Sequence, residues 1–434
     1  MKKQAGRFIL FALVLLLSFG LTACSKKEAV KAQEAEVGFK PRLDTTTKCT
    51  ITVVGHYNNF EALEAEFNLF NQYYPNVEMN YTYLDNYNGI ITTAVSSAEA
   101  PDIFFTYPWM AYQEKYASLY ETALDLADPA LGIDLSCIRG SLLYRDANGK
   151  VPTVPIYTTT YGMMVNETIF EKEGIKVPKT YSELLSACEA LKKAGYANPI
   201  MAYNRGNFML FSLYFPYFCA QVQGNGKALQ DLNAMKEGSG EYMRSSLELA
   251  ADFMSRGFVD IESCNTLQND YNAVIMRFFE GDIPMMLASG NTVSGTEKRE
   301  SQSEAFTARP FRYSFQPVPS TEQGGYFLNS ISLGFAINGK SANLDMAKEF
   351  MRFLVNTEEL NRMAKSKRMV TPCKEMVLDD IYAAFGQLDA SHVINLSELG
   401  LDDAPDQQVR KAGGQVSNGN MTVDEAVAAF GTLQ

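Results

Sequence analysis

The chain has 434 residues, a formal net charge of −12, and 38 Lys and Arg residues against 50 Asp and Glu residues. Its length suits two or three domains, and because the acidic balance comes without a basic cluster, nucleic acid is excluded as an expected partner. Aromatic residues make up 12%, with 23 tyrosines and one tryptophan, which suits either an aromatic core or surfaces that stack and hydrogen-bond at once.

Residues 1–23 have the pattern of a lipoprotein signal peptide. Basic residues at 2, 3 and 7 precede the apolar run 8–21, and about 14 residues at about 1.5 Å each give roughly 21 Å of helix, too short for a bilayer core of about 30 Å. The run ends Leu-Thr-Ala before Cys24, which resembles the lipobox at which bacterial lipoproteins are cut and lipidated. The alternative is an ordinary cleavage site beside a chance cysteine. We expect lipidation of Cys24, a flexible polar tether over 24–47, and an extracytoplasmic protein anchored to the cell membrane.

The next part of the chain predicts alternating strands and helices. Strands are predicted over 49–54, 77–84 and 103–107, and helices over 60–74 and 90–98. This order is typical of a doubly wound α/β unit with a parallel sheet, in which ligands bind beyond the carboxyl ends of the strands. Those ends carry Tyr57, Asn58, Asn59, Asp85, Asn86, Tyr87, Tyr107 and Trp109.

Residues 151–170 predict a crossing between two lobes. Two prolines keep the backbone extended at the start, and the β-branched and aromatic run 156–161 predicts a strand. Gly162 is expected to end that strand, 163–165 to resume as a second one, and Asn166 or Thr168 to cap a helix. Because a polar, aromatic strand is unusual in a core, we expect Tyr157 and Tyr161 to face the space between the lobes.

The remaining elements follow from periodicity and capping signals. Thr180 with Glu183, and Thr422 with Glu425, predict capping boxes at helix starts. The residues 297–304 are polar and predict a mobile segment. Further strands are predicted over 198–203, 283–288, 313–318 and 326–337, helices over 245–256 and 344–354, and an aromatic helix or hairpin over 208–218.

Seven cysteines are scattered along the chain. With Cys24 lipidated, six remain, namely Cys49, Cys137, Cys188, Cys219, Cys264 and Cys373. They show no C-x-x-C and no metal-ligand spacing, so we expect no metal site and no cofactor. Six cysteines allow fifteen pairings, and the sequence does not choose among them.

Four blocks of sequence carry a resemblance to a known family. They are PDIFFTYPW, VPIYTTTYGMMVNETIFEKEGIKVPKTYSELL, FFEGDIPMMLASGN and LGFAINGKSANLDMAKEFMRFLVNTE, in that order behind the lipobox. From about Cys49 to the C-terminus the chain resembles the substrate-binding lipoproteins of bacterial ABC importers, in the extracellular solute-binding family that includes the maltose-binding protein. The resemblance implies an α/β, two-lobed periplasmic-binding-protein-like fold, each lobe a sheet flanked by helices, joined by hinge strands. Lobe one would hold 48–156 and 331–373, and lobe two 157–330 and 374–434, closing on a ligand by hinge motion.

The resemblance also implies the ligand and the partner. Members of this branch mostly bind mono- and oligosaccharides and deliver them to a membrane permease, and we expect a monomer. Sugars need aromatic planes together with amides and carboxylates. The family often places a tryptophan just after the strand 283–288, where this chain has Asn291, so stacking would come from Trp109 and the tyrosines. The candidate substrate-binding residues are Tyr57, Asn58, Asn59, Trp109, Tyr157, Tyr161, Arg205, Asn291, Tyr326 and Asn329.

Three other functions compete with this interpretation. The residues 334–341, GFAINGKS, match the phosphate-loop pattern, but they continue a predicted strand and cannot form the curled loop that phosphate needs. A glycoside hydrolase needs two carboxylates about 5–9 Å apart, and the chain has no H-E-x-x-H or G-x-S-x-G motif for other hydrolytic chemistry. A glycan-capture lipoprotein without a transporter is the third alternative. We predict a binding protein and not an enzyme.

Overall fold

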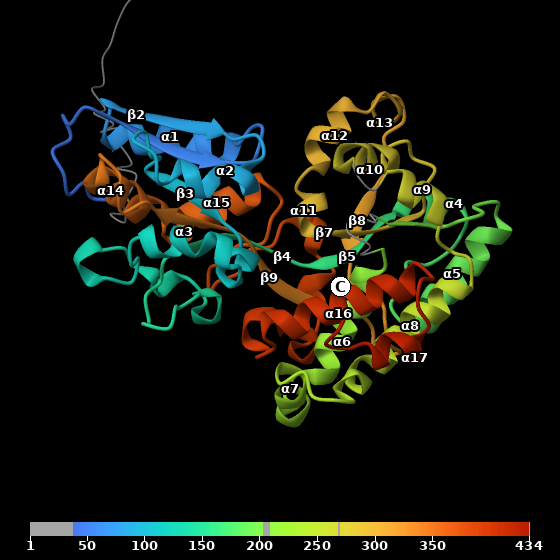
Figure 1. The fold of residues 1–434 in the computed structure, drawn as a ribbon. Helices are drawn as coiled ribbons and strands as arrows, with labels where there is room; N and C mark the ends of the chain where they lie inside the picture. Colours follow the sequence, from blue (N-terminus) through green and yellow to red (C-terminus); the bar gives the residue numbers. More distant parts are fainter. Residues whose placement is uncertain (1–37, 203–208, 268–269, 434) are drawn as a thin grey trace, which may run out of the picture. The chain divides into compact units, whose positions relative to one another are not determined.

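The computed structural model of the chain describes residues 38–202, 209–267 and 270–433. Residues from Pro41 onward form one compact unit, drawn in Figure 1, and residues 38–40 of the preceding stretch contain no helix or strand. The predicted signal peptide and the lipidated Cys24 lie outside the described residues. Within these residues, no helix is both long enough and apolar enough to cross a membrane.

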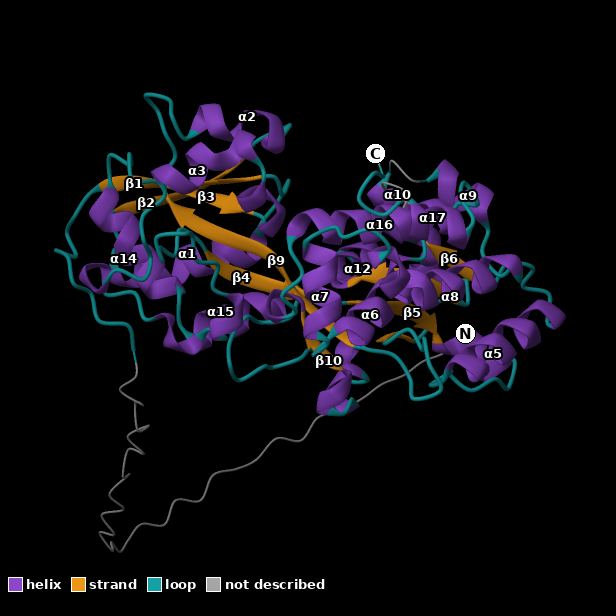
Figure 2. Cartoon of the chain, turned by 60° about the horizontal axis from the view of Figure 1, so that its bottom comes forward, coloured by secondary structure: helices purple, strands orange, loops and turns teal. Residues whose placement is uncertain are grey.

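The strands form two sheets, which Figure 2 shows in orange. The strands are β1 (Cys49–Gly55), β2 (Val77–Tyr83), β3 (Ile103–Thr106), β4 (Val154–Thr159), β5 (Tyr161–Asn166), β6 (Ile200–Ala202), β7 (Met285–Ser289), β8 (Tyr313–Gln316), β9 (Phe327–Ile337) and β10 (Val393–Asn395).

The helices surround these sheets on both sides (Figure 1). They are α1 (Glu61–Tyr73), α2 (Tyr87–Ala94), α3 (Ala117–Thr122), α4 (Glu167–Lys172), α5 (Tyr181–Lys193), α6 (Phe211–Val222), α7 (Gly226–Asn233), α8 (Arg244–Ser255), α9 (Ile261–Thr266), α10 (Tyr271–Phe278), α11 (Gly290–Val293), α12 (Thr296–Gln302), α13 (Glu304–Ala308), α14 (Leu344–Leu354), α15 (Thr357–Ser366), α16 (Asp403–Ser417) and α17 (Val423–Ala428).

The first sheet has the strand order β10-β9-β3-β1-β2, with β4 paired to β9. Strand β1 runs parallel to β2 and β3, and β9 runs antiparallel to β3 and β4. Helix α1 packs against α14 and α15 beside this sheet. The predicted order of strand, helix, strand, helix and strand is confirmed, so the carboxyl ends of β1, β2 and β3 meet at one edge.

The second sheet has the order β6-β7-β5-β8. Strand β5 is antiparallel to β7 and β8, whereas β6 is parallel to β7. Helix α6 contacts β5 and β7, and α16 packs on α6 and α8. The aromatic segment predicted as a helix or hairpin is therefore a helix, buried between this sheet and α16.

Two strands connect the sheets. Strand β4 belongs to the first sheet and β5 to the second, with only Thr160 between them. The predicted break at Gly162 is wrong, because that glycine lies inside β5, where a side-chain Cβ would stand 2.5 Å from the Gln316 carbonyl oxygen of β8. The start of β9 pairs with β10, and its end pairs with β3. The predicted lobe boundaries after 156 and 330 fall inside β4 and β9.

In the segment that matches the phosphate-loop pattern, residues 334–337 are the end of strand β9, as predicted, and a turn follows at 339–340. Gly334 lies in β9, where a Cβ would meet the hydroxyl oxygens of Thr153 and Thr106 at 2.6 and 2.7 Å. After the strand, the Asn338 side chain donates hydrogen bonds to the carbonyl oxygens of Val95 and Pro101. The glycine thus serves close packing, and the extended backbone presents no cradle for phosphate.

The beginning of the compact unit is fixed to α14 by a buried carboxylate. Glu349 is 4% exposed, and its Oε1 accepts hydrogen bonds from the Arg42 amide at 2.8 Å, the Tyr74 hydroxyl at 2.6 Å and Arg352 Nη2 at 2.7 Å. Burial alone would raise the pKa of Glu349, but these donors together hold it below its ordinary value. The residues 42–43, part of the predicted tether, are therefore bound to the folded unit.

Tyr74→Phe is expected to lower the free energy of unfolding by about 2 kcal/mol, because it removes a buried hydrogen bond to a charged group. Since the folded-state pKa of Glu349 is depressed, the stability it contributes is present above the ordinary value of 4.5 and is lost as the pH falls through the folded pKa. Urea unfolding at neutral and acidic pH measures both effects. Tyr112→Phe, at a ring that is 60% exposed, is the control; an equal loss in both variants would contradict the role of Tyr74.

Candidate functional site

Aromatic side chains gather at the carboxyl edge of the first sheet. After β3, the rings of Tyr107 and Trp109 stack in parallel with centroids 5.8 Å apart and planes 5° apart. Trp109 also meets Tyr116 edge to face at 5.4 Å. The Tyr107 hydroxyl shares a hydrogen bond with Nδ1 of His56, the first residue after β1. Because Trp109 is only partly buried, this stack presents a supported aromatic plane at the edge of the sheet.

Tyr57 is held in place beside this stack. Its backbone amide donates to the Tyr81 hydroxyl at 2.9 Å, and that hydroxyl donates to the Tyr57 carbonyl, also at 2.9 Å. The Tyr57 ring lies 4.6 Å from the His56 ring and 5.5 Å from that of Phe105. Burial raises the pKa of Tyr57, so the hydroxyl stays protonated and can donate at physiological pH.

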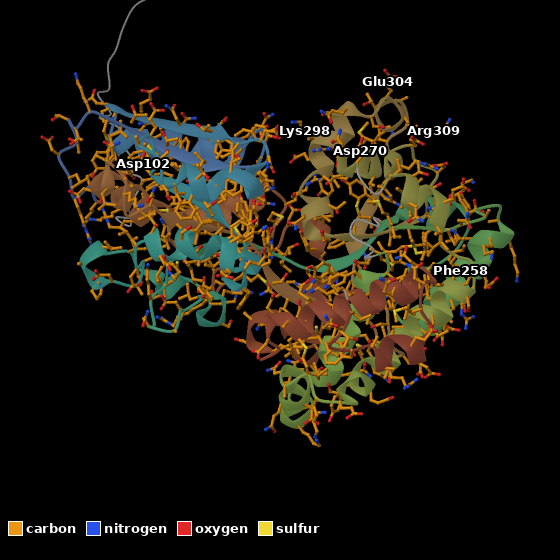
Figure 3. All side chains as sticks on the ribbon, viewed as in Figure 1. Asp102, Phe258, Asp270, Lys298, Glu304 and Arg309 are labelled. Atoms are coloured by element: carbon orange, nitrogen blue, oxygen red, sulfur yellow. The ribbon has the colours of Figure 1, made fainter. Side chains whose placement is uncertain are left out.

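A groove of about 510 Å³ lies between the loop after β1 and the two helices α10 and α12. It is lined by Asn58, Asp270, Tyr271, Asn272, Lys298, Arg299 and Gln302. Arg299 Nε donates to Asn272 Oδ1 at 2.9 Å, which fixes α12 to the start of α10. Figure 3 labels Asp270, the N-cap residue of α10, and Lys298 of α12. With its amide oxygen turned toward α12, Asn59 accepts a hydrogen bond from Lys298 Nζ at 3.2 Å.

Positive charge accompanies the aromatic rings at this edge. Lys367 Nζ lies 5.6 Å from the centroid of the Tyr57 ring and 4.0 Å from Glu61 Oε2. Burial lowers the pKa of Lys367, the Glu61 carboxylate opposes that change, and the nearby cations Lys298 and Arg299 add to it. A polar ligand in this region would therefore find several charged hydrogen-bond donors for its hydroxyl groups, next to the faces of aromatic rings.

Asn291, which follows the second sheet, contacts the groove residue Tyr271. It follows β7, where Gly290 donates its amide to the Thr160 carbonyl at 2.8 Å. The Tyr271 hydroxyl donates to the Asn291 carbonyl, and Asn291 Oδ1 accepts from the Ser332 hydroxyl at 2.7 Å. Tyr57, Asn58, Asn59, Trp109 and Asn291 are thus the predicted residues that the structure brings to this region.

Four of the other predicted residues lie in described parts of the chain, namely Tyr157, Tyr161, Tyr326 and Asn329. The expectation that Tyr157 faces the space between the lobes is wrong, since its side chain is 1% exposed. The centroid of its ring lies 6.1 Å from that of the buried Phe60 ring. Tyr161 is partly buried, with its ring edge to face with Phe211 at 4.6 Å. Tyr326 stacks on His392 at 5.2 Å. Asn329 is fully buried and donates to Asn395 Oδ1 at 3.1 Å. Arg205 lies outside the described residues.

The helices α10 and α12 supply groove residues that were not predicted. Lys298, Arg299 and Gln302 come from the segment 297–304, for which a mobile segment was predicted, whereas the structure forms helix α12 there. Tyr271 and Asn272 begin α10, whose N-cap Asp270 accepts a hydrogen bond from the Ala273 amide. That Asp at the helix start was a usable signal, because Asp is a preferred N-cap residue.

The acidic residues of the groove bear on the alternative of glycoside hydrolysis. Among the described residues that line it, Asp270 is the one carboxylate, and it already accepts a hydrogen bond from a backbone amide. Hydrolysis of a glycosidic bond needs a pair of carboxyl groups across the substrate. The described part of the chain also contains no group of three or more His, Cys, Asp or Glu residues that could hold a metal ion.

Two sheets flanked by helices are joined by the crossing from β4 to β5, and a groove rich in amide and charged side chains lies between them. Such an arrangement is typical of proteins that bind a small polar ligand. The model of the family described as bacterial extracellular solute-binding protein matches residues 55–360. The chain belongs to this family, as the sequence blocks predicted. Membership implies an extracytoplasmic location and a binding function.

Similar proteins agree with this assignment. The multiple sugar-binding protein of Streptococcus mutans is 22% identical over 365 residues, which are 81% of this chain and 79% of that protein. The solute-binding protein RafE in complex with raffinose has a TM-score of 0.67 at 17% identity and covers 88% of this chain and 98% of its own. The GacH receptor of Streptomyces glaucescens, solved unliganded and with acarbose, has a TM-score of 0.63 at 18% identity and covers 89% and 97%. These structures confirm the predicted fold class.

Proposed function

We propose that the protein binds a sugar or oligosaccharide in the groove between its two sheets and delivers it to the permease of an ABC importer. The observation that carries this proposal is the supported Tyr107–Trp109 stack at the carboxyl edge of the first sheet, which is hydrogen-bonded to His56 in the loop that also carries the groove residue Asn58. A sugar ring offers an apolar face to an aromatic plane and hydroxyl groups to amides and charged donors, so both halves of the ligand find partners.

The relatives support a carbohydrate ligand. The S. mutans relative is named a multiple sugar-binding protein, and two solved relatives hold raffinose and acarbose. In this proposal the ligand is captured without being cleaved, since Asp270 is the single carboxylate among the described residues that line the groove. The lipid on Cys24 holds the monomeric protein at the outer face of the cell membrane, where the permease receives the sugar.

Hinge closure is the proposed way of capture. The units that move are the two predicted lobes, 48–156 with 331–373 and 157–330 with 374–434, and the strands β4 and β9 contain their boundaries. Closure would bring Asn58 and the aromatic stack toward α10 and α12, which carry the opposite wall of the groove. Such a motion bends a few residues at strand ends and leaves both cores intact.

Thermal unfolding of the mature chain against a panel of mono- and oligosaccharides tests the proposal. A ligand that binds only the folded state stabilises it by about 2.7 kcal/mol at a hundredfold excess over its dissociation constant. We expect one class of sugar to raise the unfolding temperature, with the sugar recovered unchanged afterwards. Absence of any shift over the whole panel would overturn the carbohydrate assignment, and recovery of cleaved sugar would overturn binding without catalysis.

A further inference from the structure

Two cysteines far apart in the sequence lie beside the strand that connects the sheets. Cys137 ends the short helical turn Leu135–Cys137 in the loop before β4, and Cys373 follows α15. Ile138 pairs with Cys373 in an antiparallel bridge. The Lys374 amide donates to the Cys137 carbonyl at 2.8 Å, and the Arg139 amide donates to the Pro372 carbonyl at 3.1 Å. Backbone hydrogen bonds therefore hold the two segments together on both sides of the cysteines.

Both are free cysteines in this structure, and each is the first cause of the shift in the other's pKa. The Cys137 thiol also donates to the Asp134 carbonyl at 3.8 Å. Cys373 is fully buried, whereas Cys137 is partly exposed. A disulfide requires close and fixed backbones at its two ends, and the paired segments supply both. The structure thereby singles out this pair among the six described cysteines.

The surroundings favour a reactive thiolate at the buried position. The neighbouring Cys137 thiol holds the pKa of Cys373 below its ordinary value of 9.0, while the pKa of Cys137 is raised in turn. The nearby Arg139 guanidinium also lowers the pKa of Cys373, against the effect of burial. Arg139 is fixed by hydrogen bonds from Nη2 to the Thr371 carbonyl at 2.7 Å and to the Thr158 hydroxyl at 3.4 Å. A thiolate is the species that attacks a disulfide in exchange reactions.

We propose that Cys137 and Cys373 form an intrachain disulfide when the protein meets a small-molecule or protein disulfide outside the cytoplasm. The accessible Cys137 thiol passes its proton to the Cys373 thiolate, and the Cys137 sulfur then attacks the oxidant disulfide, which forms a mixed disulfide and releases one oxidant thiolate. That thiolate takes the proton from Cys373, whose sulfur attacks the Cys137 sulfur and expels the second oxidant thiolate. Two protein thiols are oxidised to one disulfide, and the oxidant disulfide is reduced to two thiols. The extracytoplasmic location that the family implies supplies the oxidising surroundings.

The bond would act on the connection between the sheets. The segment before Cys373 pairs with β4, because the Thr158 amide donates to the Val370 carbonyl at 2.8 Å and the Val370 amide donates back at 3.2 Å. A covalent link from this segment to the loop at Cys137 ties that loop to the crossing strand. It also closes a long stretch of chain, which restricts the unfolded state. The proposal depends on the extracytoplasmic location that the family implies. It does not depend on which ligand the protein binds.

Peptide mapping of the mature chain after incubation with oxidised glutathione tests the proposal. We expect a peptide pair joining Cys137 to Cys373, a mass lower by two hydrogen atoms, and an unfolding temperature several degrees above that of the protein reduced with dithiothreitol. Cys137→Ser and Cys373→Ser should abolish the link and the shift. Cys49→Ser, at a partly exposed cysteine in β1, is the matched control and should keep both.

Three outcomes would overturn the proposal. Alkylation of both thiols after oxidation would show that the pair does not close. Glutathione retained on Cys137 would show that the Cys373 thiolate does not complete the exchange. A link between other cysteines would assign the bond elsewhere. Because the peptide map and the redox-dependent unfolding temperature are read on the unmodified chain, the test does not depend on the folding of any variant.

Discussion

Trp109→Ala is expected to raise the dissociation constant for the bound sugar about tenfold, because loss of a stacking aromatic removes roughly 1 kcal/mol or more of binding free energy. The parallel stack with Tyr107 holds the indole in place before the ligand arrives, so little conformational entropy is lost on binding. Titration calorimetry with the sugar identified by thermal unfolding measures the change. The fold should persist, since Trp109 is only partly buried.

Two further variants separate stacking from general loss of an aromatic group. Trp109→Phe keeps a ring at the position and should recover part of the affinity. Tyr112→Ala removes an exposed ring from the same short helix, Pro108–Tyr112, and should leave binding unchanged. Trp109 is the sole tryptophan of the chain, so its fluorescence in the unmodified protein should change on titration with the sugar. An affinity unaltered by Trp109→Ala would remove this residue from the site.

Local signals in the sequence were sufficient for most of the fold. The capping boxes predicted at Thr180 and Thr422 are both formed, each with its glutamate three residues later. The carboxyl edge of the first sheet was also predictable, because parallel strands separated by helices place their ends at one edge. Tyr57 and Trp109 follow two such strands, and their positions required no knowledge of distant parts of the chain.

Long-range packing explains why the predictions for Tyr157 and for residues 297–304 were wrong. All six residues of β4 are buried, so the alternation that distinguishes an inner face from an outer face does not apply, and Tyr157 belongs to the core. Helix α12 has no apolar periodicity of its own. It is stabilised by Arg299 on Asn272 and by Glu300, which accepts a hydrogen bond from Arg368 at 3.0 Å. Such contacts outweigh the low intrinsic preference of a short polar segment for the helical conformation.

Arg362→Met is expected to lower the free energy of unfolding by about 3–5 kcal/mol, because it leaves a buried carboxylate without its partner. Glu66 in α1 is 0% exposed. Arg362 in α15 donates to it from Nε at 2.9 Å and from Nη2 at 3.2 Å, in a two-pronged pairing. Arg362 also forms an ion pair with Glu359, so its removal leaves two acidic groups close together. Methionine keeps most of the apolar stem, and the loss therefore reports mainly on charge.

The pH dependence of this loss identifies its cause. Burial raises the pKa of Glu66 above its ordinary value of 4.5, and Arg362 limits that rise. A carboxyl group whose folded pKa is raised binds more protons in the folded state, so stability falls as the pH rises from that ordinary value through the folded pKa. Without Arg362 the folded pKa rises further and the fall extends to higher pH. The destabilisation should therefore be largest at neutral pH and should shrink toward pH 4.5.

Urea unfolding of the variant at several pH values provides the measurement. Arg244→Met is the matched control, because Arg244 pairs with Glu241 at the protein surface, where water replaces the lost partner. A second variant, Glu66→Gln combined with Arg362→Met, removes both charges and should recover much of the stability, since no carboxylate then remains buried. A loss that is equal at all pH values, or that persists in the double variant, would show that Arg362 stabilises the contact between α1 and α15 through packing and not through charge.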